Sequence, residues 1–162
     1  MVNCELPLSD LRRCAADPAF VERMAGLYEE LDGQISVRSP VCVNRGACCR
    51  FGEFGHRLFV TTAELANFLA RLDGPIRPAE GWDACPYQER GRCSVRAGRP
   101  GGCRIFFCDS AGLGWQERVT EAFLDRIRRV HQDFGLPYVY LDWLAALDQL
   151  GEVDTAARQP VG

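Results

Sequence analysis

The sequence predicts one small, mostly α-helical domain with irregular loops, in which helices pack around a loop-rich cysteine cluster. Apolar residues recur at helical spacing near both ends of the chain, whereas glycine, proline and most of the cysteines gather between them. The chain has 162 residues, the length of one ordinary domain. Nearly half of its residues are apolar, which is enough to build a core. We therefore expect residues 1–162 to form a single cysteine-cluster domain.

The first region, residues 7–37, is predicted to be helical. Ser9 is a candidate N-cap for a short helical turn that ends near Ala16. Asp17 followed by Pro18 is a stronger start signal, because aspartate favours the N-cap and proline the first helical position. The residues of the expected buried face recur every three or four positions: Phe20, Met24, Leu27, Leu31 and Ile35.

The middle region, residues 38–112, is predicted to be the metal-binding part and consists mainly of loops. Residues 57–60 have the composition of a short strand. Thr61 and Glu64 have the spacing of a capping box, which would open a helix that continues to about Leu72. From Trp82 to Cys108 we expect turns, with room for one short hairpin. Such a segment has little apolar core of its own, and a bound metal can supply folding energy instead.

The third region, residues 114–150, is predicted to contain two helices. The first carries an apolar stripe of Val119, Phe123, Ile127, Val130 and Phe134. His131 falls on the charged side of this helix, so we expect it to be solvated. Gly135 and Pro137 end the first helix, and the second is expected from Tyr138 to Leu150. Residues 151–162 are predicted to be a frayed tail.

The cysteines give the strongest functional signal. Thiolates are soft ligands that select zinc, copper(I) or iron–sulfur clusters. The N-terminus has no apolar stretch of signal-peptide length, so we expect a cytoplasmic protein whose cysteines stay reduced. An odd total of nine cysteines also argues against a closed disulfide framework. The seven predicted metal ligands are Cys42, Cys48, Cys49, Cys85, Cys93, Cys103 and Cys108.

Two local features of this pattern concern the choice and number of metals. Cys48 and Cys49 are adjacent, and successive side chains diverge, so we expect them to serve two sites or one of them to bridge two metals. Cys85 is followed by Pro86, a pair that also closes ligand runs of iron–sulfur proteins. Cys4 and Cys14 lie outside the cluster and are expected to be packing or surface thiols.

The pattern resembles the YkgJ-type cysteine-cluster family, which is described as a zinc- or iron-chelating domain. The family pattern is C-x-x-C-G-x-C-C, then C-P, C and R-P-x-x-C-R-x-F-x-C. In this chain residues 42–49 read CVNRGACC, followed by Cys85-Pro86, Cys93 and RPGGCRIFFC over residues 99–108. The resemblance covers about two-fifths of the chain and implies metal binding, with both iron–sulfur and zinc in play.

The chain departs from this family pattern at one position. Arg45 stands where the family has its second cysteine, so seven cysteines match rather than eight. The resemblance leaves several sources for an eighth ligand. They are His56, Cys4, Cys14 and water, or the ligand is lost.

The charge pattern bears on the partners. All 19 basic residues are arginine, and the net charge is −3. Nine arginines lie near the cysteines, where guanidinium groups can offset the negative charge of a thiolate-ligated metal. An RNA- or phosphate-binding patch is the competing interpretation. The acidic total makes nucleic acid an unlikely partner, and no apolar run has the length of a membrane span.

We therefore predict a metal-binding protein that holds an iron–sulfur cluster or zinc or iron ions, with a role in electron transfer or metal handling. Cys85-Pro86 and the nearby arginines favour the iron–sulfur cluster over zinc. One alternative is a zinc-stapled interaction module. Another is a component of a redox or modification enzyme, although the sequence contains no G-x-S-x-G, H-E-x-x-H or P-loop motif. The protein partner is not specified by the sequence.

Overall fold

A computed structural model describes residues 5–38, 47–106 and 113–158. Within these ranges the protein is mostly α-helical, as predicted, with seven α-helices and two two-stranded sheets. The two N-terminal helices are α1 (Leu8–Ala16) and α2 (Pro18–Arg38). Asp17 Oδ1 accepts a hydrogen bond from the backbone N–H of Ala19 at 2.9 Å, which supports the predicted start of α2.

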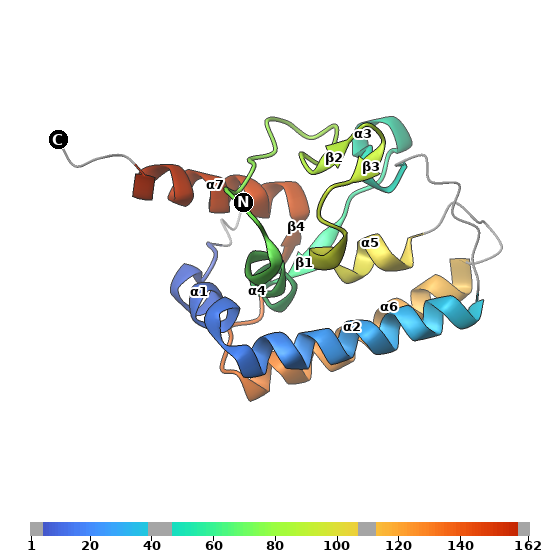
Figure 1. Ribbon diagram of the computed structural model, residues 1–162. Coiled ribbons are helices and arrows are strands. Elements are labelled where there is room, and N and C mark those ends of the chain that lie inside the picture. The colour runs from blue at the N-terminus through green and yellow to red at the C-terminus, as the bar shows by residue number, and fades with distance from the viewer. Residues whose placement is uncertain (1–4, 39–46, 107–112, 159–162) are drawn as a thin grey trace.

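Helix α2 runs side by side with α6 (Leu113–Asp133), and the two helices are antiparallel (Figure 1). Their predicted apolar stripes face each other. Phe20 of α2 meets the Phe134 ring edge-on at 5.3 Å, and Tyr28 lies 5.6 Å from the ring of Phe123. Most of the stripe residues are buried, so helical periodicity predicted this layer correctly.

A short antiparallel ribbon connects the middle of the chain to its C-terminal part. Strand β1 (Phe59–Thr61) pairs with β4 (Tyr140–Asp142), with Val60 opposite Leu141. Helix α4 (Thr62–Arg71) follows β1 directly. Its capping box is present as predicted, because the Thr61 side chain accepts from the N–H of Glu64 and the Glu64 side chain accepts from the N–H of Thr61.

The C-terminal part differs from the prediction at both ends. The predicted helix from Tyr138 is instead β4 followed by α7 (Trp143–Arg158), because residues 140–142 form ladder bonds with β1. Asp142 Oδ1 then accepts from the N–H groups of Leu144 and Ala145 and caps the helix. The frayed tail predicted for residues 151–162 is wrong for 151–158, which continue α7. Residues 159–162 lie outside the described part of the chain.

The cysteine-rich segments lie together on one side of α4, above the α2–α6 layer (Figure 1). They comprise η1 (Ala47–Cys49), α3 (Phe51–Phe54), the β2–β3 hairpin (Gln88–Glu89 and Arg92–Cys93), η2 (Arg96–Gly98) and α5 (Gly101–Ile105). The hairpin was expected, whereas the short helices were not. A helix of three to five residues has too few apolar positions to produce a periodic signal.

One apolar core joins the helices, and its composition corrects the expectation for His131 and agrees with a packing role for Cys14. His131 is only 4% exposed rather than solvated, because both ring nitrogens find backbone partners: Nδ1 donates to the Leu136 carbonyl at 2.9 Å and Nε2 accepts from the Ala63 N–H at 3.3 Å. Cys14 is a fully buried core residue. No helix in the described ranges has the length and apolar character to cross a membrane.

Candidate metal centre

Five of the seven predicted ligands come together from four separate segments. Cys48 and Cys49 belong to η1, Cys85 to the loop before the hairpin, Cys93 to β3 and Cys103 to α5. The six cysteines of the described ranges, these five and Cys14, are all free thiols. Cys42 and Cys108, the other two predicted ligands, lie outside the described residues, as does Cys4.

Backbone hydrogen bonds hold two of these segments side by side. The N–H of Cys85 donates to the carbonyl of Cys49 at 2.8 Å, and the N–H of Gly52 donates to the carbonyl of Asp83 at 2.9 Å. Gly52 is needed there, because a Cβ at this position would come within 3.2 Å of the Asp83 Cα. These two hydrogen bonds fix the segment that contains Cys48 and Cys49 against the segment that contains Cys85.

The prediction that Cys48 and Cys49 point apart is wrong. Their Sγ atoms are 3.9 Å apart, and Cys49 also forms a thiol hydrogen bond with Cys85. Alternation of side chains between opposite faces is a property of extended strands, whereas these residues lie in a 3₁₀ turn. Three sulfurs from two segments are therefore in mutual contact, with Cys49 in the middle.

The contacts divide the thiols into two classes. The hydrogen bond from Cys49 lowers the pKa of Cys48 to about 6, with help from the positive charge of Arg99. The same donor, together with the Trp143 indole N–H at 3.3 Å, lowers the pKa of Cys85 to about 7. The pKa of Cys49 is raised, because it holds the proton that its two neighbours share. Cys48 and Cys85 are thus the two cysteines of the group whose pKa values are lowered.

The remaining two cysteines keep their protons. Burial raises the pKa of Cys93 and, more strongly, that of Cys103. The thiolates of Cys85 and Cys48 raise both values further, since ionising another sulfur nearby would place like charges together. All five sulfurs can be ionised together only if positive charge enters the cluster.

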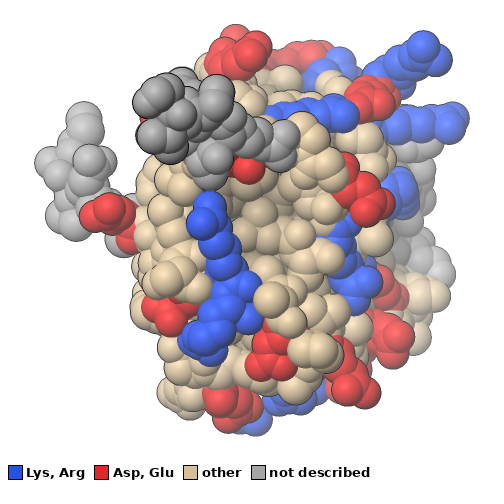
Figure 2. Space-filling view, turned by 60° about the vertical axis from the view of Figure 1, so that its left-hand side comes forward, with Lys and Arg blue, Asp and Glu red and all other residues tan. Residues whose placement is uncertain are grey.

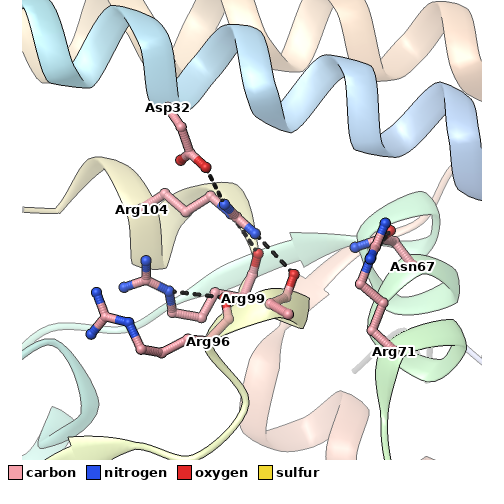
Figure 3. A network of polar contacts seen from close by, with 7 residues as sticks. Asp32, Asn67, Arg71, Arg96, Arg99 and Arg104 are labelled. Atoms are coloured by element: carbon pink, nitrogen blue, oxygen red, sulfur yellow. Dashed lines mark hydrogen bonds and ion pairs between the residues drawn. The ribbon is translucent and has the colours of Figure 1, made fainter.

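Arginines supply part of that positive charge and hold the surrounding loops. Arg99 and Arg96 both act electrostatically on Cys48, and Figure 3 shows their guanidinium groups extending in the same direction. Arg104 has a different role. Its guanidinium donates to Asp32 Oδ2 at 2.7 Å and to the carbonyls of Arg99 and Ala97 at 3.0 Å (Figure 3). Arg104 therefore anchors the η2 loop to α2. In α5 it directly follows Cys103.

His56 is a further candidate ligand beside the cluster. Its ring stacks on Phe106, with centroids 4.9 Å apart and planes 11° apart, and meets Phe51 edge-on at 5.2 Å. Its Nε2 lies 3.4 Å from the carbonyl oxygen of Cys48. Cys14 is elsewhere, between α1 and the core, and the charges that act on its thiol are Arg13, Asp10 and Asp17. Cys14 is therefore not part of the centre.

A cavity of about 430 Å³ opens beside the cluster. Cys48, Cys103 and His56 contribute to its wall, together with the aromatic rings of Phe106 and Tyr140. Across residues 5–38, 47–106 and 113–158, no three His, Cys, Asp or Glu side chains form a ready-made coordination group. The sulfurs are gathered, but they are not arranged around one ion in this conformation.

No protein-family model, curated protein or solved structure matches this chain. The resemblance to the YkgJ-type family accordingly rests on the cysteine pattern alone.

On the face shown in Figure 2, acidic and basic side chains are interspersed over the surface.

Two residues that position the cluster were not identified from the sequence as doing so. Trp143 is buried in the core, and its indole N–H donates to the Cys85 sulfur. Glu64 was expected to cap α4, and its second oxygen also accepts from the N–H of Gly101 at the start of α5. Only the capping-box spacing signalled Glu64, and no local signal marks the long-range partner of either residue.

Proposed function

We propose that this protein binds a thiophilic metal centre, zinc or an iron–sulfur cluster, through its clustered cysteines. Cys48, Cys49, Cys85, Cys93 and Cys103 would hold it, joined by Cys42 and Cys108 from the sequence pattern. The observation that carries the proposal is the gathering of five free thiols from four segments, close enough to alter one another's pKa values. A mere packing role would not require these sulfurs to gather in one place.

The donor set fits such a centre chemically. In a tetrahedral site with metal–sulfur bonds of about 2.3 Å, two sulfurs on one metal are about 3.8 Å apart. The Cys48 and Cys49 sulfurs are 3.9 Å apart, so this edge already has the length that two thiolates need to share one ion. Tetrahedral sulfur ligation is typical of both zinc and iron–sulfur sites, which leaves the choice of metal to experiment.

The protein's own groups would supply charge and orientation. Cys48 and Cys85 are the sulfurs whose pKa values favour the thiolate, so they are the expected first ligands. The Trp143 N–H would hold the Cys85 sulfur in place, and Arg99 would offset negative charge. A bound iron–sulfur cluster would supply one-electron chemistry, whereas zinc would supply folding energy or Lewis acidity.

Anaerobic purification of the full chain tests the proposal and separates the two metals. A brown protein with charge-transfer absorption and stoichiometric iron and sulfide identifies an iron–sulfur cluster. A colourless protein with stoichiometric zinc identifies a zinc site. If the folded chain contains neither metal and takes up neither after reconstitution under reducing conditions, the proposed function is wrong.

The cavity beside Cys48 and Cys103 favours one second candidate, a component of a redox or modification enzyme. Its volume of about 430 Å³ is within the range of small-molecule sites. Replacing Thr120 in the cavity wall by Trp should abolish ligand-dependent activity but leave metal content unchanged. If metal binding and all activity survive this filling, the cavity has no role in catalysis.

A further inference from the structure

The ring of His56 is held in one orientation by its neighbours. Phe106 stacks on one face, with an interplanar angle of 11°, while Phe51 contacts the ring edge-on. A stacked imidazole between two aromatic rings cannot tilt freely, so the directions of its two nitrogens are fixed. This fixation matters because a metal ligand must present its lone pair in a defined direction.

The hydrogen bond of His56 determines which nitrogen has a free lone pair. Nε2 lies 3.4 Å from the Cys48 carbonyl oxygen, which can only accept, so Nε2 carries the proton in this contact. In the neutral ring Nδ1 then has the lone pair. Nδ1 is buried, and no donor reaches it from the described parts of the chain. A buried acceptor without a donor is unusual in a folded protein, and such a position suits a bound ion or water.

The position of His56 beside Cys48 and Cys103 favours a metal ion as the partner of Nδ1. Metal-binding histidines usually donate their other N–H to a carbonyl or carboxylate, and here the carbonyl belongs to Cys48 itself. His56 also shares a cavity wall with the Cys48 and Cys103 side chains. The second histidine, His131, has both nitrogens engaged by backbone groups far from the cluster and is not available as a ligand.

From these observations we propose that Nδ1 of His56 is a nitrogen ligand of the cysteine centre. The inference rests on the proposed function and extends it from an all-sulfur site to a mixed sulfur–nitrogen site. Imidazole is a common ligand of zinc and also occurs on iron–sulfur clusters. Because a neutral imidazole replaces a thiolate, the centre would carry one negative charge fewer than an all-cysteine site.

Cobalt(II) is a suitable probe, because it takes tetrahedral sites of zinc type and is paramagnetic. The reduced full chain is loaded with cobalt(II), once with natural histidine and once with ¹⁵N-labelled histidine, and pulsed electron paramagnetic resonance records nitrogen coupling. We expect a histidine coupling that changes on labelling and that is absent in H56F, which keeps an aromatic ring but has no nitrogen. H56F should also bind cobalt at least about tenfold more weakly.

The variant F106L removes the stacking partner of His56 but leaves Nδ1 in place. It should retain the nitrogen coupling and bind cobalt more weakly than the wild type, because the imidazole ring is no longer held in one orientation. A cobalt-loaded wild-type chain without histidine coupling overturns the inference while leaving the proposed function intact. A wild-type chain that folds and takes up neither cobalt nor zinc nor an iron–sulfur cluster overturns both. The labelled wild type decides the question even if H56F does not fold.

Discussion

Glu64 Oε1 accepts a hydrogen bond from the backbone N–H of Gly101 at 2.8 Å, across 37 positions of sequence. Its other oxygen, Oε2, accepts from the N–H and the hydroxyl of Thr61 at 2.8 and 3.0 Å. One buried carboxylate therefore caps α4 and fixes the first residue of α5, the helix that carries Cys103. A local capping motif is thus also a long-range link to the candidate metal centre.

Replacing Glu64 by Gln should destabilise the protein. An amide has one accepting oxygen, so it cannot serve Gly101 and Thr61 together, and a buried N–H is left unpaired. We expect a loss of about 1–3 kcal/mol in the free energy of unfolding, measured by urea denaturation. The control is Glu117→Gln at an exposed position of α6, which should change stability by less than about 0.5 kcal/mol. Equal unfolding midpoints for the two variants would contradict this role of Glu64.

Gly101 is also restricted by packing. A Cβ there would lie within 2.9 Å of Phe123 Cδ1, so Gly101→Ala should cost about 1–3 kcal/mol through overpacking. The matched change is Gly33→Ala in α2, where a Cβ meets nothing within 4 Å. Alanine is the better helix former, so that change should stabilise the protein by about 0.5–1 kcal/mol. Thermal or urea unfolding of both variants checks the sign of each effect. A Gly101→Ala protein as stable as the wild type would show that α5 packs less closely than described.

Arg104 should be intolerant of Lys. Its guanidinium donates to Asp32 and to two loop carbonyls, and it lies 4.2 Å from the Tyr28 ring centroid. A single ammonium group cannot reach all of these partners. We expect Arg104→Lys to cost about 1–3 kcal/mol and to increase amide exchange in residues 96–99. Arg92→Lys at the exposed hairpin position is the control and should be close to neutral. Unchanged exchange in residues 96–99 would refute the anchoring role.

The sequence was sufficient for the helices and insufficient for contacts between distant segments. Periodicity located α2 and α6 because each buries a long apolar stripe, and the capping box located the start of α4. Strand β4 was missed because its three residues are defined by pairing with β1 rather than by any local pattern. The apolar residues of β4 also fit the beginning of the helix that was predicted from Tyr138.

For the candidate site too, the sequence predicted the residues but not the contacts between distant segments. Spacing and residue type predicted the cysteines to be ligands, but the distances among Cys48, Cys49 and Cys85 depend on how two loops meet. The expectation for Cys48 and Cys49 failed because it applied the geometry of a strand to a 3₁₀ turn. The burial of His131 was missed because its partner Ala63 is 68 residues away.

His131 should make stability depend on pH. Burial lowers its pKa below the ordinary value of 6.5, so the unfolded chain binds a proton more readily than the folded one. Stability is therefore full above about pH 6.5 and decreases as the pH falls through the lowered folded pKa. Cys48, with a pKa of about 6, titrates in the same pH range. Both the wild type and H131N contain Cys48, so the measurement compares their urea midpoints between pH 7.5 and pH 5. The wild type should lose more stability than H131N over this interval, and parallel curves would contradict the prediction.

The half-buried Cys85 and the buried Cys14 should separate metal binding from packing. Cys85 contacts Cys49 and accepts from Trp143, so Cys85→Ala should remove bound metal or reduce its stoichiometry. Cys14 lies in the α1 core, so Cys14→Ala should retain the full metal content and lose about 1 kcal/mol of stability. Elemental analysis and urea unfolding of the same preparations give both quantities. Loss of metal from the Cys14 variant with full retention in the Cys85 variant would place the centre elsewhere in the chain.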